Sequence, residues 1–223
     1  MHRPLAAAAL LLLLAGCGRD ADGGAPPAAL APADTPAAAD APPATAPEWR
    51  TNPVEGVTLR PGGLVTVETG PHTLLWPQGS EDVQPPYTVR ATMLKHDGRI
   101  HEGYGLMFGA RGVEGAEEDG HAYSYFLVRG DGSFLVKRRD GPTTPVVRDW
   151  TRHPRIHRES GGAPRPNELE ARVGVDTTVF LVNGAEVARV PSAELATAGR
   201  AGLRIAHDVV VEVRAFHAGP AAQ

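Results

Sequence analysis

Apolar and polar residues alternate along most of the chain beyond residue 62, a period of two that is typical of half-buried β-strands. The clearest case is residues 87–95, where one face is apolar and the other carries Thr88, Arg90 and Thr92. About ten antiparallel strands predict an all-β fold, either a two-sheet β-sandwich or a barrel. The other predicted strands are residues 63–68, 72–76, 104–109, 123–129, 133–139, 170–175, 178–182, 186–190, 201–206 and 209–216.

Turn residues between these segments support antiparallel pairing. Gly130-Asp131-Gly132 separates residues 123–129 from 133–139, and Asn183-Gly184 follows residues 178–182. Both tips contain residues that adopt the positive φ angles of tight hairpins. Only residues 192–196 predict a brief helix, with Ser192 as its N-cap.

The N-terminal segment has the layout of a secretory signal peptide. His2 and Arg3 precede the apolar run 5–14, which is shorter than the roughly 20 residues that a membrane-spanning helix needs. The run leads to Leu14-Ala15-Gly16-Cys17, which resembles the lipobox of bacterial lipoproteins. That resemblance implies cleavage before Cys17, acylation of Cys17 and stable attachment to a membrane through several acyl chains. Gly18 in place of Asp implies the outer membrane of the bacterial cell envelope, facing the periplasm or the surface.

Composition divides the rest of the chain into a tether and one domain. Residues 17–47 are rich in Ala and Pro, which predicts an extended, disordered tether behind the lipidated N-terminus. Residues 48–218 are numerous enough for one β-domain with a good core, and residues 219–223 are expected to be a flexible tail. Removal of residues 1–16 takes away Arg3 and changes the formal charge from −4 to −5. An acidic chain with dispersed Lys and Arg excludes nucleic acid as a partner.

The order of several short motifs resembles the jelly-roll domains of the concanavalin A-like lectin/glucanase superfamily, including laminin-G-like domains and bacterial 3-keto-disaccharide hydrolase domains. The resemblance covers about residues 87–216 and implies a two-sheet sandwich more than an activity. The motifs that carry it are Tyr104-Gly-Leu-Met-Phe-Gly, Tyr123-Ser-Tyr-Phe-Leu-Val-Arg-Gly-Asp-Gly-Ser-Phe, Trp150, Asn167-Glu-Leu, Val182-Asn-Gly and Gly202-Leu-Arg-Ile.

Catalytic and metal-binding motifs are scarce in this sequence. The Glu-x-Asp-x-Glu pattern of glycosidases with this fold is absent. Residues 113–121 form a polar loop, and we interpret its acidic part, Glu117-Glu118-Asp119-Gly120-His121, as solvated. Hydrolase activity of the 3-keto-disaccharide type would need groups such as Glu102, Asp149 or His101 to converge, so the question of an enzyme stays open. We expect no cofactor, although Asp97-Gly98 and Asp131-Gly132 leave a calcium-binding turn as an alternative.

The best candidate for binding is the strand 123–129. Tyr123, Tyr125 and Arg129 alternate on one side of it, and Lys137 and Trp150 could be neighbours across the sheet. Aromatic rings beside a fixed guanidinium suit a sugar, so these residues predict a glycan site on the concave sheet.

The same strand allows two other interpretations. The tyrosines could fill the core, in which case Ser124, Phe126 and Val128 would face outwards. The domain could also be a structural module that contacts another protein.

Overall fold

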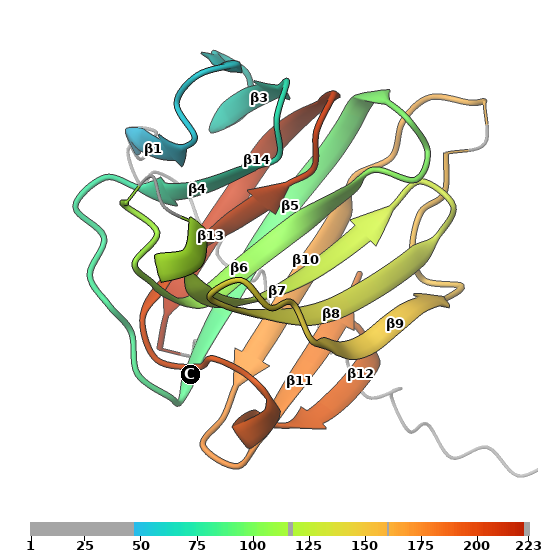
Figure 1. Cartoon of the computed structure of the whole chain (residues 1–223). Coiled ribbons are helices and arrows are strands. Elements are labelled where there is room, and N and C mark those ends of the chain that lie inside the picture. The colour runs from blue at the N-terminus through green and yellow to red at the C-terminus, as the bar shows by residue number, and fades with distance from the viewer. Residues whose placement is uncertain (1–46, 116–117, 160, 221–223) are drawn as a thin grey trace, which may run out of the picture. The chain divides into compact units, whose positions relative to one another are not determined.

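The computed structural model describes residues 47–115, 118–159 and 161–220, so Cys17, the signal peptide, the tether up to residue 46 and the last three residues lie outside it. The described chain forms two antiparallel sheets of seven strands each (Figure 1). In order, the first sheet contains β1 (Trp49–Asn52), β4 (Thr73–Pro77), β13 (Arg200–Ile205), β6 (Gly103–Arg111), β7 (Ala122–Arg129), β8 (Ser133–Asp140) and β9 (Val146–Arg152). The second contains β12 (Ala185–Pro191), β11 (Thr177–Val182), β10 (Asn167–Val173), β5 (Tyr87–Gly98), β14 (Val209–Gly219), β3 (Val65–Thr69) and β2 (Val57–Arg60).

Several pairs of successive strands are divided between the two sheets, as a jelly roll requires. β5 belongs to the second sheet and β6 to the first, and β13 and β14 are divided in the same way. The predicted all-β fold and two-sheet antiparallel sandwich are therefore confirmed. Strands β6 to β9 follow one another as a meander, which brings residues from 103 to 152 together on one sheet.

The main core lies between the sheets. Phe126 of β7 contacts Phe180 of β11 with ring centroids 5.0 Å apart, and Phe108 of β6 lies 6.0 Å from Phe180. All three rings are fully buried. Burial of each ring contributes a few kcal/mol, and tilted aromatic pairs add about 0.5–1.5 kcal/mol. The apolar face predicted for residues 87–95 also joins this core.

The predicted hairpin tips are confirmed by the backbone. Asn183 and Gly184 have φ angles of 51° and 77°, and Gly132 has a φ of 84°. Gly109 lies in a bulge between β6 and β7 with a φ of 61°, and a Cβ at this position would come within 2.2 Å of the Ala196 carbonyl oxygen. A glycine is therefore required there for both conformation and space.

Three strands were not predicted from the sequence. β1 and β2 have only four residues each, and β9 is mostly exposed, with polar side chains at four of its seven residues. All three are edge strands, which bury little apolar surface and so carry a weak alternating signal. Trp49 of β1 is nevertheless anchored, because its ring lies edge-on to Phe216 with centroids 5.4 Å apart.

The predicted helix is shorter than expected, and its predicted cap is wrong. Residues Ser192–Glu194 form a single 3₁₀ turn, and Pro191 is its N-cap. The Ser192 hydroxyl donates to the Gly174 carbonyl at 2.8 Å and lies 2.8 Å from the Thr178 hydroxyl. The side chain therefore connects the turn to β11 instead of capping it. Across the described ranges, we find no helix with the length and apolar character needed to span a bilayer.

Candidate ligand-binding face

The first sheet has apolar side chains on both of its faces. On β7, Phe126 and Val128 point into the main core, whereas Tyr123, Tyr125 and Leu127 belong to a second cluster on the opposite side. We call this opposite side the aromatic face. The interpretation in which the tyrosines fill the main core is therefore wrong. The second cluster contains Leu74, Trp76, Met107, Ala110, Val113, Tyr123, Tyr125, Leu127 and Leu135, with Trp150 packed against it.

Arginine side chains lie over the rings of the aromatic face. The Cζ atom of Arg129 is 4.2 Å from the centre of the Trp150 ring, and that of Arg204 is 4.6 Å from the Tyr125 ring. Arg200 lies above Trp76 at 5.8 Å. These distances are typical of cation–π contacts. The guanidinium groups and their stems shield the apolar layer from water.

The tyrosines are less accessible than a stacking platform requires. Tyr123 is 2% exposed and Tyr125 is 4% exposed. Burial raises the pKa of the Tyr125 hydroxyl, while Arg204 and Arg139 oppose the shift. The half-buried residues available to a ligand are instead Trp150 and the basic side chains above the rings.

The five predicted site residues all come from three adjacent strands, β7, β8 and β9. Tyr125 pairs with Lys137 across β7 and β8, so their side chains share a face. Trp150 lies against Arg129 and over Gly103, and its expected proximity to Lys137 stays a prediction. Lys137 pairs with Val146 of β9, and its amine is 3.4 Å from the Thr144 hydroxyl.

Three of the arginines on this face have carboxylate partners. Arg129 donates two hydrogen bonds to Asp131, at 3.0 Å and 2.8 Å. Burial tends to raise the pKa of Asp131, but these bonds and those from Ser133 outweigh it and hold the pKa at about 2. Arg139 pairs with Glu118 at 2.7 Å, and Arg200 pairs with Glu114. These pairs fix the guanidinium groups in position.

Sequence reasoning missed Arg200 and Arg204. Arg204 and Leu74 pair across β13 and β4, which places the arginine on the aromatic face. The sequence does indicate that Arg204 faces away from the main core, because it lies between Leu203 and Ile205, which both belong to that core. Nothing in the sequence pairs β13 with β6, however, and that pairing brings Arg204 to Tyr125.

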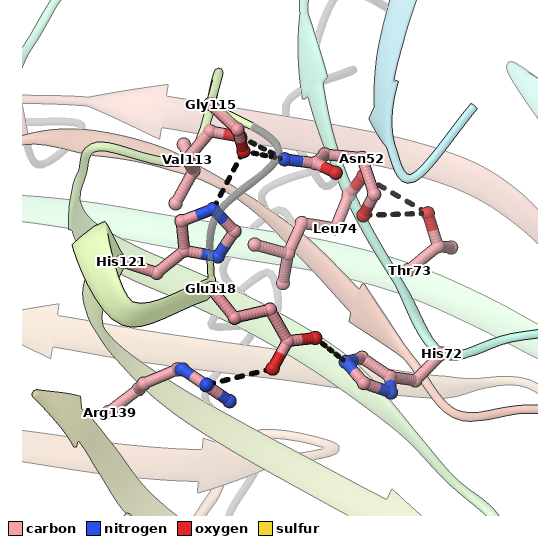
Figure 2. A network of polar contacts seen from close by, with 9 residues as sticks. All are labelled: Asn52, His72, Thr73, Leu74, Val113, Gly115, Glu118, His121 and Arg139. Carbon is pink, nitrogen blue, oxygen red and sulfur yellow. Dashed lines mark hydrogen bonds and ion pairs between the residues drawn. The ribbon is translucent and has the colours of Figure 1, made fainter. Parts of the chain in front are cut away.

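A small pocket of about 100 Å³ lies beside Leu74 and Tyr123 of the aromatic face, and Figure 2 shows several of its lining residues. Its lining includes His72, Glu118, His121 and Tyr123. Glu118 bridges two bases, with His72 at 3.3 Å and Arg139 at 2.7 Å. Burial and the nearby Arg204 lower the pKa of His72, although Glu118 partly opposes this shift.

Two described residues of the segment that precedes β7, Val113 and His121, are held by contacts with the rest of the domain. The Asn52 amide donates to the carbonyls of Val113 and Gly115 at 2.6 Å and 2.7 Å, and His121 bonds the Gly115 carbonyl at 2.9 Å (Figure 2). Val113 and His121 are buried. Glu118, Asp119 and Gly120 are exposed, as expected for a solvated loop, whereas the burial of His121 and the place of Val113 in the second cluster were not expected.

A larger cavity of about 190 Å³ lies at a different place, between the end of β5 and residues 157–165. The Lys95 amine, 3% exposed, contacts Glu159 at 3.0 Å and the Arg99 carbonyl at 2.5 Å. His157 bonds the Pro166 carbonyl at 2.6 Å. Its buried polar groups thus have partners within the protein, and these contacts have a sufficient structural role in holding the loop.

The groups considered for catalysis are dispersed. Glu102 pairs with His207 at 3.3 Å, Asp149 accepts the Trp150 amide at 2.7 Å, and His101 is exposed. Within residues 47–115, 118–159 and 161–220, no hydrogen bond or ion pair joins these three, and no three His, Cys, Asp or Glu side chains gather as metal ligands. Calcium at the Asp-Gly turns stays an untested alternative.

Comparisons with known proteins support the fold. No family model matches the chain, and no curated protein sequence matches it. Among solved structures, the chain is similar to the carbohydrate-binding module CBM66 from Bacillus subtilis, with a TM-score of 0.58, 13% identity and coverage of 77% of this chain and 94% of that one. The carbohydrate recognition domain of Emp46p in its potassium-bound form gives a TM-score of 0.55, 12% identity and coverage of 78% and 89%.

A third similar structure is a Bacillus subtilis protein of unknown function with a galectin-like fold. Its TM-score is 0.51 at 12% identity, and the match covers 77% of this chain and 89% of that protein. Sequence identities this low carry information about architecture and not about particular residues. The chain therefore has a jelly-roll β-sandwich of the galectin-like kind.

Proposed function

We propose that this protein is a carbohydrate-binding lipoprotein of the bacterial cell envelope. Acylated Cys17 would anchor it, most simply in the outer membrane, and residues 17–47 would hold the β-domain away from the lipid. The fold supports the binding part of the proposal, because two of its structural neighbours are named as a carbohydrate-binding module and a carbohydrate recognition domain. Cys17 and its preceding residues support the anchor.

The observation that carries the proposal is the position of Arg129 above Trp150. Both side chains are half-buried, and Asp131 fixes the guanidinium with two hydrogen bonds. A rigid pair of this kind loses little side-chain entropy when a sugar binds. The indole offers apolar surface to the C–H groups of a sugar ring, and the guanidinium offers hydrogen-bond donors to its oxygens.

The tyrosines have a supporting role in this proposal. Tyr125 lies beneath the guanidinium of Arg204, and the Tyr123 ring packs beside that of Tyr125 with centroids 5.7 Å apart. Lys137 is the cross-strand neighbour of Tyr125 and is available to a ligand on β8, beside the edge strand β9. The proposed contact residues are therefore Arg129, Lys137 and Trp150, with Tyr123 and Tyr125 beneath.

A glycan array with the full chain in mild detergent tests this function. We expect retention of at least one envelope polysaccharide, with about tenfold weaker binding for Trp150→Ala. Arg172→Ala is the matched control, because Arg172 is an exposed residue of β10 on the other sheet and should not affect binding. Failure to retain any glycan, or equal loss in the control variant, would refute the proposal.

A further inference from the structure

Basic groups are concentrated on the aromatic face although the chain as a whole has a formal charge of −4. Three carboxylates, Glu114, Glu118 and Asp131, are paired with bases there. Six basic side chains share the face by cross-strand register or ring contact, which leaves an excess of three positive charges over these carboxylates. The six are Arg50, Arg129, Lys137, Arg139, Arg200 and Arg204.

Arg204 and Lys137 are central in this argument. Neither forms an ion pair with any residue of the described segments, although both are half-buried. The Nε atom of Arg204 has no hydrogen-bond partner within those segments, as is also true of Arg139 and Arg200, but only the guanidinium of Arg204 lies over Tyr125 without a carboxylate partner. A partly desolvated cation without a counter-charge costs free energy, which a bound anion would recover.

The hydrogen-bonding capacity of the face is also one-sided. Arginine and lysine only donate hydrogen bonds, and the three carboxylates already accept bonds from Arg129, Arg139 and Arg200, so donors outnumber the remaining acceptor sites among these charged groups. A neutral sugar presents hydroxyls that both donate and accept. A carboxylate, sulfate or phosphate group only accepts, and its geometry matches the fork of a guanidinium. An acidic sugar therefore fits this face better than a neutral one.

We propose that the ligand of the aromatic face is an acidic polysaccharide, and that Arg204 and Lys137 receive its anionic groups. This inference rests on the proposed function and adds the chemical class of the glycan. The acidic sugar would lie across β13, β6, β7 and β8, with one anionic group between the two cations and a ring beside Trp150. Arg129 would contact ring oxygens and not the anionic group, because Asp131 already neutralises its charge.

Two matched polymer pairs provide the test, each with one backbone and a changed charge: polygalacturonate against its methyl ester, and dextran sulfate against dextran. We expect the full chain to bind the acidic member at least about tenfold more tightly in one of the two pairs. Increasing the salt concentration should weaken this binding. Arg204→Gln should remove most of the preference, and Arg172→Gln on the other sheet should keep it.

Each outcome has a distinct meaning. Equal binding of the acidic and neutral members would overturn the acidic class while leaving a glycan-binding function intact. No binding of any polymer on these pairs or on the array would refute both proposals. An acid preference that survives both Arg204→Gln and Lys137→Gln would indicate general charge attraction and would overturn the assigned site. Arg204→Lys keeps the positive charge but removes the forked guanidinium donors. Unchanged far-UV circular dichroism shows that all variants fold, so that differences between them report polymer binding.

Discussion

The guanidinium of Arg129 lies 4.2 Å above the Trp150 ring and is held there by two hydrogen bonds to Asp131. The three residues come from the end of β7, the hairpin tip and β9. Asp131 thus has two roles, since its Oδ1 atom also accepts the Ser133 amide at 3.0 Å and shapes the turn. The β7–β8 hairpin therefore also positions Arg129 over Trp150, the two residues that we propose contact the ligand.

Asp131→Asn should reduce both stability and glycan binding. The pKa of Asp131 falls from its ordinary value of 3.8 to about 2 in the folded protein. A lowered pKa means that the stabilisation is fully present above pH 3.8 and is lost as the pH falls towards 2. A shift of this size corresponds to about 2 kcal/mol at neutral pH. Urea unfolding should show that Asp131→Asn lowers the free energy of unfolding by this amount at pH 7, and hardly changes it at pH 2.

Asp140→Asn is the control for that experiment. Asp140 pairs with Arg138 at 3.0 Å, but it is exposed, so its loss should change the free energy of unfolding by less than about 0.5 kcal/mol. If Asp131→Asn is no more destabilising than Asp140→Asn, the assigned role of Asp131 is wrong.

Gly103→Val should displace the Trp150 ring without breaking the sheet. A Cβ at residue 103 would lie 3.2 Å from the Trp150 Cη2 atom and 3.3 Å from Leu127 Cδ1, so a larger side chain must move the indole. We expect a destabilisation of about 1–3 kcal/mol and weaker glycan binding. Gly162→Val is the control, because nothing lies within 4 Å of a Cβ there. Undiminished binding in Gly103→Val would argue against Trp150 as a contact residue.

Phe180→Ala should be among the most destabilising single substitutions. Its ring is fully buried between Phe108 and Phe126 and connects the two sheets. Removal of such a ring typically costs about 3–5 kcal/mol. Val175→Ala, at a residue 71% exposed, should cost almost nothing. Chemical denaturation measures both, and a loss below about 1 kcal/mol for Phe180→Ala would contradict the assigned core.

Cys17→Ser should release the protein from membranes. The substitution removes the thiol that the lipobox resemblance assigns to acylation, and the short apolar run 5–14 cannot span a bilayer by itself. Membrane fractionation and mass spectrometry of the N-terminal peptide measure the outcome. Unchanged fractionation, or a mature peptide without acyl chains in the unsubstituted protein, would refute the anchor.

The alternation of residues 123–129 was enough to group Tyr123, Tyr125 and Arg129, because the period of a strand is two. It could not decide which group faces the main core, since both faces of β7 are apolar and both become buried. Pairing between strands distant in the chain decided this, and it also brought Arg204 to Tyr125. The edge strand β9 was missed because most of its residues are exposed and its apolar residues, Val146, Val147 and Trp150, do not alternate regularly with polar ones.

The most direct measurement of the central claim is tryptophan fluorescence during titration with a polysaccharide that the full chain retains. The chain has three tryptophans; Trp49 packs against Phe216 and Trp76 is 3% exposed, so Trp150 should report a ligand on the aromatic face. We predict a saturable change in emission that is largely lost in Trp150→Phe. Binding with unchanged emission, or a full-size change in Trp150→Phe, would contradict a glycan site beside Arg129 and Trp150.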